Sequence, residues 1–169
     1  VAPSRGLGDV YKRQADTCPG DALPEIHPVM DTIRATFSDV NRSNVGFGST
    51  IFAVKPGDGS AREQAASCQK VLGGWANIAN EYATKRYRSN LINWGMIPFV
   101  IDQGELPFHN LDYLFVPKIR EAIADGKTEF EAYVVKDGAL KPFTLRMGEL
   151  TPDEKDIILK GCLINYYRG

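Results

Sequence analysis

The sequence predicts a single layered α/β domain that contains some antiparallel strands. Its 169 residues, 43% of them hydrophobic, are enough for one well-buried core and too few for two ordinary domains. Compact β-branched runs alternate with amphipathic helical patterns along most of the chain, and a hairpin pattern stands near the C-terminus. This order of elements is typical of a sheet covered by helices.

The first predicted elements surround a glycine-rich loop. A short helix is predicted over residues 29–37, and the apolar, β-branched run over 49–55 (STIFAVK) indicates a buried strand. A helix over 60–71 is predicted after the loop, because Ser60 and Glu63 form the S-x-x-E pattern of a capping box.

The next elements continue the alternation. We predict a short strand over 75–79, a helix over 82–94 that ends at Gly95, and a strand over 96–101 (MIPFVI). Three residues at helical spacing predict the buried face of this helix: Tyr87, Leu91 and Trp94.

The antiparallel strands are predicted in the C-terminal third of the chain. The predicted elements are, in order, a strand, a helical turn and the two strands of a hairpin: 114–116, 118–124, 130–135 and 142–146. The hairpin closes around the turn residues 136–138 (KDG). The last helix is predicted to begin with Thr151 as N-cap and Pro152 at its first position.

Composition narrows the possible classes of function. The formal net charge is -1 with both signs interspersed, so small molecules and proteins are better expected partners than nucleic acid or membrane. No apolar run approaches the roughly 20 residues of a membrane-spanning helix, and no secretory signal is evident, so we expect a soluble, cytoplasmic protein. The cysteines are odd in number and lack C-x-x-C spacing, which predicts neither a disulfide framework nor a local metal site: Cys18, Cys68 and Cys162.

The N-terminal segment 4–14 (SRGLGDVYKRQ) has no hydrophobic period. Its back-translation resembles the transposase adapter used in preparing DNA for sequencing, so we interpret residues 1–14 as an adapter translation outside the fold. A disordered natural terminus is the alternative. On the first interpretation, residues 15–169 are the natural domain and belong to a longer protein.

The segment with the strongest chemical character is residues 57–64 (GDGSAREQ), between a predicted strand and a helix start. The first N–H groups of a helix have no intrahelical partner and lie at the positive end of the helix dipole, which favours a carboxylate or phosphate. The glycines let the backbone approach a ligand, and Arg62 offers a planar fork that matches a carboxylate.

A purely structural interpretation of the same segment stays open. Ser60 is then only an N-cap, Glu63 its capping-box partner, and Arg62 a solvated side chain of the first turn. The segment is not a Walker loop either, because no Gly-Lys-Ser/Thr follows.

Three segments follow one another along the chain: GDGSAREQAA from Gly57, LGG at 72–74 and KRYRSNLINWGMIPF at 85–99. Together they resemble the C-terminal domain of aconitases and isopropylmalate dehydratases. In that family a loop of the form GxGSSREHAA precedes LGG and, later, a pattern like RIHxSNLxxxGxLPL. The likeness is clear over 49–99, and a G-x-L-x-N pattern at 161–165 matches more weakly. It implies a three-layer β/β/α swivelling domain.

The resemblance implies a hydro-lyase, an aconitase-like hydratase that removes and re-adds water on a hydroxy-polycarboxylic acid. In such enzymes a [4Fe-4S] cluster held by upstream domains acts as Lewis acid, so the chain is expected to need those domains as partners and to be inactive alone. Position by position, Ser60 matches the serine that abstracts a proton from carbon, and Arg62 matches an arginine that binds a substrate carboxylate. Gly59 and Ala61 complete the implied substrate-binding loop. A serine can act as base only if its alkoxide is stabilised, which helix-start N–H groups and an arginine can provide.

Two positions depart from the family pattern. Ala61 replaces its second serine, and Gln64 replaces its histidine. A hydrogen bond to a charged group contributes about 1.5 to 3 kcal/mol, so the missing hydroxyl predicts a different or smaller acid, or weak activity. A further substrate-binding arginine upstream of the loop has no assigned position, and Arg34 and Arg42 are candidates by location only.

Other polar residues are predicted to be structural. His27 and His109 are expected on the surface or in loops, and Asn90 in packing or a helix-end contact. The basic residues of one helix are expected to form a solvated face: Lys85, Arg86 and Arg88.

Three functional hypotheses follow. The first is the swivel domain of a single-chain hydratase, which the adapter-like leader and the RSNL pattern favour. The second is a separate small subunit of an isopropylmalate-type dehydratase. The third is a non-catalytic paralogue with a role in regulation or assembly, for which Ala61 would be the sign of lost activity.

Overall fold

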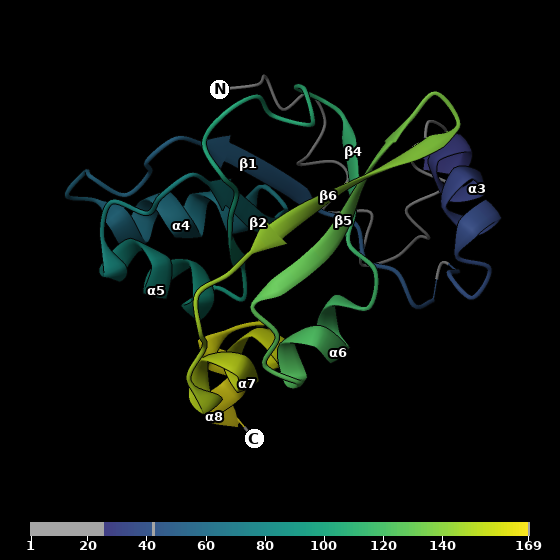
Figure 1. The fold of residues 1–169 in the computed structure, drawn as a ribbon. Coiled ribbons are helices and arrows are strands. Elements are labelled where there is room, and N and C mark those ends of the chain that lie inside the picture. The colour runs from purple at the N-terminus through teal and green to yellow at the C-terminus, as the bar shows by residue number, and fades with distance from the viewer. Residues whose placement is uncertain (1–25, 42, 169) are drawn as a thin grey trace. The chain divides into compact units, whose positions relative to one another are not determined.

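The computed structural model describes residues 26–41 and 43–168 (Figure 1). The adapter-like segment, Cys18 and Arg42 therefore lie outside the described residues. The described residues divide into two compact units. The first holds residues 105–117 and 131–143 with the described residues up to Phe47, and the second holds residues 48–104, 118–130 and 144–168. The whole of the candidate segment 57–64 belongs to the second unit.

The first unit contains helix α3 (Ile26–Thr36), strand β4 (Tyr113–Phe115) and most of strands β5 (Glu129–Lys136) and β6 (Ala139–Arg146). Its core is a cluster in which Ile33, Phe115 and Val135 are buried. The turn between β5 and β6 has positive φ at Asp137 (52°) and Gly138 (71°), as a two-residue hairpin turn requires. The predicted hairpin and the predicted helix near residue 30 are confirmed.

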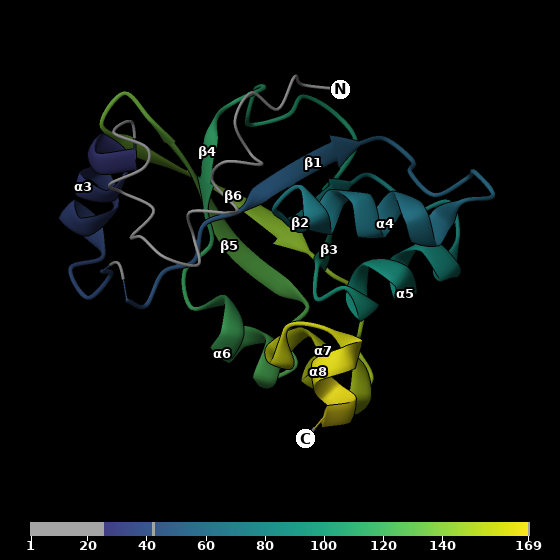
Figure 2. The ribbon, with the colours of Figure 1, turned by 180° about the vertical axis from the view of Figure 1, so that it is seen from behind.

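The second unit is built on three parallel strands, β1 (Ser49–Ala53), β2 (Gly74–Ala79) and β3 (Ile97–Val100). Helix α4 (Arg62–Val71) joins β1 to β2, and α5 (Lys85–Asn93) joins β2 to β3. Both crossovers between neighbouring parallel strands take the same hand, so α4 and α5 lie side by side, as Figures 1 and 2 show.

Three further helices complete the second unit: α6 (Ile119–Ala124), α7 (Pro152–Lys160) and α8 (Leu163–Arg168).

The hydrogen-bonded strand order is β1-β2-β3-β6-β5-β4, with β6 antiparallel to β3 and β4 antiparallel to β5. The prediction of an α/β fold with some antiparallel strands is confirmed.

The core beneath α4 and α5 follows the predicted face of α5. Tyr87 is 2% exposed and Leu91 is fully buried, and they pack with Ala66 of α4 and Met96. Trp94 lies half-buried at the edge of the same cluster. The helix itself begins later than residue 82, because Thr84 is its N-cap and accepts a hydrogen bond from Tyr87 N at 3.2 Å.

The prediction that residues 49–55 form a buried strand is half wrong. The strand exists as β1, but Ile51 is 42% exposed and Val54 63% exposed. The reason is its place in the sheet, since β1 is an edge strand and pairs with β2 alone among the described strands. An apolar β-branched run indicates a strand, but it does not show which elements cover it.

The start of α7 is capped as predicted. Thr151 Oγ1 accepts from Glu154 N at 3.2 Å, and a Glu154 carboxylate oxygen accepts from Thr151 N at 2.9 Å, which completes a capping box.

Replacing Thr151 with alanine should therefore lower the free energy of unfolding by about 1 kcal/mol, the usual contribution of such a cap. Urea denaturation of the wild type and the variant measures the difference. An unchanged midpoint would contradict the cap's contribution.

Candidate functional site

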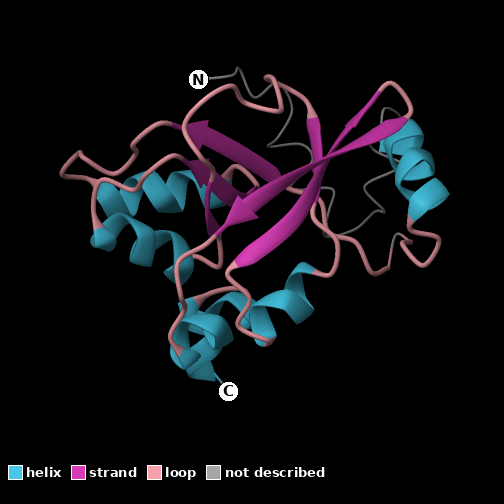
Figure 3. Ribbon diagram, viewed as in Figure 1, coloured by secondary structure: helices cyan, strands magenta, loops and turns pink. Residues whose placement is uncertain are grey.

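The loop between β1 and α4, drawn as loop in Figure 3, is anchored to the segment that follows β2. Glu81 N donates to Val54 O at 3.1 Å, and Ala83 N donates to Pro56 O at 2.9 Å. These bonds extend the parallel pairing of β1 and β2 beyond the ends of the strands. The loop therefore leaves the sheet only after Pro56.

Gly57 makes the turn at which the loop leaves the sheet. Its φ is +97°, and a Cβ added there would stand 2.5 Å from Tyr87 Cβ, so the position excludes a side chain. Its carbonyl oxygen accepts two hydrogen bonds, from Arg62 Nε at 3.1 Å and from Thr84 Oγ1 at 3.3 Å. Gly57 is thus packed against Tyr87 and hydrogen-bonded to Arg62 and Thr84.

The predicted capping box at Ser60 and Glu63 is wrong. Helix α4 begins at Arg62, its N-cap is Ala61, and no side chain caps it. The first intrahelical bond runs from Ala65 N to Ala61 O at 3.0 Å, which leaves the preceding N–H groups without an intrahelical acceptor. Ser60 is exposed, and its hydroxyl makes no hydrogen bond to any residue that the structure describes.

Arg62 is not the solvated side chain that the structural interpretation expects. It is half-buried and its Nε is bonded to Gly57 O. Among the described residues the four Nη–H donors of Arg62 have no hydrogen-bond partner. The end of the guanidinium is therefore available to a planar acceptor such as a carboxylate.

The loop and the start of α4 line an open pocket of about 420 Å³. It brings together all four residues predicted for the site, Gly59, Ser60, Ala61 and Arg62. The remaining lining residues are Pro56, Gly57, Ala65 and Tyr87. The pocket lining therefore combines a hydroxyl, a guanidinium and a helix start without a side-chain cap with several apolar residues.

Buried polar groups beneath the loop hold Tyr87 in place. Tyr87 Oη accepts from Gln69 Nε2 at 3.0 Å and from Asn77 Nδ2 at 3.2 Å. Beside it, burial, reinforced by Tyr87, raises the pKa of Tyr82 well above its usual value. The Tyr82 hydroxyl therefore stays protonated and donates to Phe99 O at 2.9 Å.

Sequence reasoning missed Thr84 and the supporting role of Tyr87. The sequence signal for Thr84 was available, since threonine is a typical N-cap residue and Thr84 stands directly before the first residue of α5. Because the helix was predicted to begin at residue 82, Thr84 was placed inside the helix and not at its N-cap.

The basic residues of α5 do not form one solvated face. Lys85 and Arg86 are exposed, but Arg88 is half-buried and pairs with Glu154 at 3.3 Å. Arg88 Nη2 also donates to the carbonyl oxygens of Gly148 and Glu149. Arg88 thus joins α5 to the start of α7.

The other polar residues that the sequence singles out lie away from the pocket at Ser60. His109 is exposed, and its backbone N donates to Asp112 at 2.8 Å. Arg34 Nε donates to Val40 O at 3.1 Å. His27 is exposed and Asn90 half-buried. None of these four lines the pocket at Ser60.

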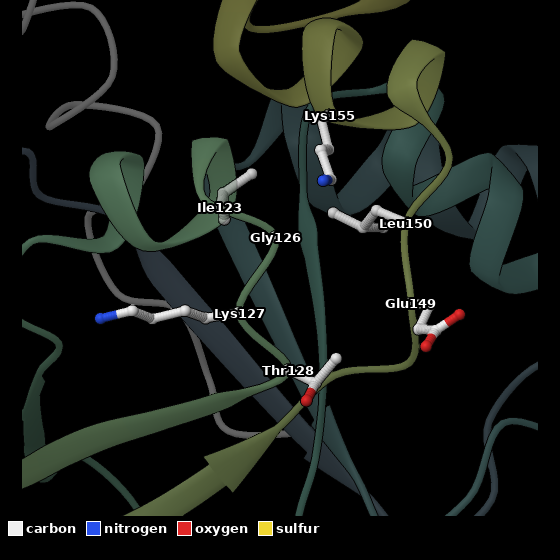
Figure 4. A pocket seen from close by; sticks show the side chains of 7 residues that line it. All are labelled: Ile123, Gly126, Lys127, Thr128, Glu149, Leu150 and Lys155. Atoms are coloured by element: carbon white, nitrogen blue, oxygen red, sulfur yellow. The ribbon is translucent and has the colours of Figure 1, made fainter.

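A second pocket, of about 250 Å³, lies between α6, the start of β5 and α7 (Figure 4). The Lys155 side chain points into it between Ile123 and Leu150. Its Nζ stands 2.6 Å from where a Cβ of Gly126 would be, at the C-terminal end of α6. An ammonium at a helix C-terminus is stabilised by the helix dipole, which explains this lysine without a ligand.

Within residues 26–41 and 43–168, no three His, Cys, Asp or Glu side chains are grouped as metal ligands. Cys68 is exposed and Cys162 half-buried, and they are free thiols. None of the helices described is both long and apolar enough to cross a membrane.

Comparisons with known proteins match the region that carries the pocket. Residues 38–104 match the family model of the aconitase C-terminal domain. A solved structure of 3-isopropylmalate dehydratase from Methanocaldococcus jannaschii is 26% identical, with a TM-score of 0.52. The alignment covers 83% of this chain and 77% of that one. No curated protein sequence matches.

Proposed function

This chain carries a C-terminal domain of the aconitase and isopropylmalate dehydratase superfamily, and from that premise we propose that it is the swivelling part of a hydro-lyase acting on a hydroxy-polycarboxylic acid. One observation carries the proposal. The hydroxyl of Ser60 and the Nη end of Arg62, neither of which has a hydrogen-bond partner among the described residues, line one pocket at a helix start without a side-chain cap.

In the proposed reaction Arg62 binds a substrate carboxylate through its Nη donors, because Nε is already bonded to Gly57 O. Ser60, as the alkoxide, accepts the proton from the carbon next to a carboxylate. The electron pair of that C–H bond forms the C=C bond, and the hydroxyl on the adjacent carbon leaves as hydroxide with the electron pair of its C–O bond. This hydroxide and the proton taken by Ser60 together make up the water that is removed. Hydration is the reverse. The N–H groups at the start of α4 and the guanidinium favour the Ser60 anion.

An iron-sulfur cluster does not fit the residues described here, since no set of thiolates is grouped to hold one. We place the cluster in another domain or subunit, where it would supply a Lewis acid for the leaving hydroxyl. Ser60 and Ala61 are exposed in this chain, so that partner also has to cover the pocket and exclude water. We expect the assembled enzyme to act in the cytoplasm and the isolated chain to be inactive.

A separate small subunit of an isopropylmalate-type dehydratase is the second candidate. It is supported by the likeness to a 3-isopropylmalate dehydratase over most of both chains. It differs from the first candidate in covalent connection and in substrate, not in the roles of Ser60 and Arg62. A non-catalytic paralogue is the third, and Ala61 alone favours it.

Turnover by the assembled protein tests the proposal. The complete gene, with the protein that carries the cluster if it is separate, is expressed and purified without oxygen, and a panel of hydroxy-acids is followed by the absorbance of the C=C bond formed. We expect turnover of at least one acid, and alkyl-substituted malates as the best substrates would favour the small subunit. A protein that holds its cluster and converts none of the panel supports the non-catalytic paralogue.

Replacing Ala61 with serine should restore a hydroxyl to the pocket. If that hydroxyl binds a carboxylate, the KM for acids with an additional carboxylate should fall about tenfold, as expected for one hydrogen bond to a charged group. Comparing KM for a dicarboxylic and a tricarboxylic acid measures the effect. An equal change for both acids would show that Ala61 does not set the preference.

A further inference from the structure

The Thr84 side chain links the start of α5 to the loop that carries the candidate site. Resting on the proposed function, we propose that Thr84 is a positioning residue that orients Arg62 for the substrate carboxylate. It acts through the carbonyl group of Gly57 and does not line the pocket itself.

The hydroxyl of Thr84 makes two hydrogen bonds of opposite sense. It accepts from Tyr87 N at 3.2 Å, which caps α5, and it donates to Gly57 O at 3.3 Å, which reaches the loop. A hydroxyl has one hydrogen to donate, and here it is given to the loop. The cap of α5 and the base of the loop are thus held by one side chain.

The Gly57 carbonyl passes this constraint to Arg62. Its oxygen has two lone pairs, and Thr84 Oγ1 and Arg62 Nε donate to it at 3.3 and 3.1 Å. Gly57 packs closely against α5, because a Cβ added there would stand 2.5 Å from Tyr87 Cβ. With its acceptor fixed, Nε fixes the plane of the guanidinium.

The fixed plane determines which edge of Arg62 meets a ligand. With Nε engaged, the side-on fork of Nε and Nη is closed, and the end-on fork of the two Nη atoms stays open. Holding a long side chain in place before the substrate arrives reduces the ordering cost of binding. Losing the Thr84 hydroxyl should therefore weaken carboxylate binding more than it slows the chemical step.

The same residue type at another helix start supplies the matched control. Thr151 caps α7 through a bond from Glu154 N, and its hydroxyl has no described bond to the loop. Removing the Thr151 hydroxyl takes away a helix cap alone. Removing the Thr84 hydroxyl takes away a helix cap and the bond to Gly57.

The test is steady-state kinetics of the assembled hydro-lyase with its preferred hydroxy-acid. Thr84→Val should raise KM about tenfold with kcat changed less than about threefold, the pattern of lost uniform binding. Thr84→Ser should return KM to within about twofold of wild type, and Thr151→Val should leave KM unchanged. Partial unfolding would lower the apparent kcat and leave KM unchanged, so KM separates positioning from stability.

A double-mutant cycle decides whether Thr84 acts through Arg62. In an Arg62→Ala background, Thr84→Val should raise KM no further. A further rise of similar size, or an unchanged KM for Thr84→Val in the wild-type background, overturns the inference while the hydro-lyase function stands. If the wild type converts no hydroxy-acid, the proposed function fails and the inference fails with it.

Thr84→Asp replaces the valine variant if that protein does not accumulate. Its carboxylate can cap α5 but has no hydrogen for Gly57 O. KM should rise in the wild-type background and not in the Arg62→Ala background. A rise in both would indicate charge repulsion of the substrate and would overturn the role of Thr84.

Discussion

Replacing Ser60 with alanine is expected to abolish turnover by the assembled hydro-lyase and to leave substrate binding largely intact. A positioned general base contributes roughly 10²- to 10⁴-fold to a rate, so kcat should fall by about that range. Because the hydroxyl makes no hydrogen bond within the described residues, its loss should not change the fold. Turnover assays together with equilibrium binding of a non-reactive acid measure the two effects separately.

Ser67 of α4 is the matched control for Ser60. Its hydroxyl donates to Gln64 O at 3.2 Å, and it is not among the residues that line the pocket. Ser67→Ala should keep kcat close to the wild-type value. Near-normal turnover by Ser60→Ala would reduce Ser60 to a loop residue and leave the proposal without its base.

Replacing Gly95 with alanine is expected to lower the free energy of unfolding strongly. A Cβ at this position would stand 1.8 Å from Gly161 O, and the residue has φ of +70°. A left-handed conformation and overpacking each cost about 1 to 3 kcal/mol, so the free energy of unfolding should fall by about 2 to 6 kcal/mol. Urea denaturation of the isolated chain gives the value.

Gly138 is the control that separates the cost of the left-handed conformation from the cost of the steric clash. Its φ is +71°, close to that of Gly95, but nothing lies within 4 Å of its added Cβ. Gly138→Ala should therefore lose only the conformational part, about 1 to 3 kcal/mol. If the two variants lost equal stability, the close approach of Gly95 to Gly161 would contribute nothing.

The same contact gives a physical reason for the pairing of two sequence patterns. Gly95 lies within the KRYRSNLINWGMIPF block, and Gly161 opens the G-x-L-x-N pattern, in which Asn165 Nδ2 donates to Lys160 O at 2.9 Å. Two backbones that approach this closely require glycine on the side where a Cβ would collide. The patterns lie far apart in the sequence because they form the two sides of one packing contact.

Much of the fold could be predicted because local rules decide it. The hairpin turn at Asp137 and Gly138 needs positive φ, and those residue types tolerate it. Thr151 and Glu154 cap α7 within three residues of each other. Tyr87 and Leu91 point inward because their helical spacing puts them on one face. Each depends on neighbours close in the chain.

Two errors arise from contacts with residues that lie outside the sequence pattern in question. The S-x-x-E pattern at Ser60 fits a capping box, but Arg62 turns back to Gly57 O and the helix begins two residues later. Arg88 has the sequence context of a surface residue, but it meets Glu154 at 3.3 Å. In both cases a contact with a residue outside the local pattern determines the outcome.

For the candidate site, the sequence by itself determined the chemical groups: a serine, an arginine and glycines at a helix start, in an order that resembles one family. It also marked the departures, Ala61 and Gln64. Only the tertiary structure decided that Ser60 is free of a capping role and that Arg62 and Thr84 meet at one carbonyl oxygen. The physical reason is that a capping pattern describes what a side chain can bond nearby, whereas a hydrogen bond from Thr84 to Gly57 exists only once β1 and β2 are paired.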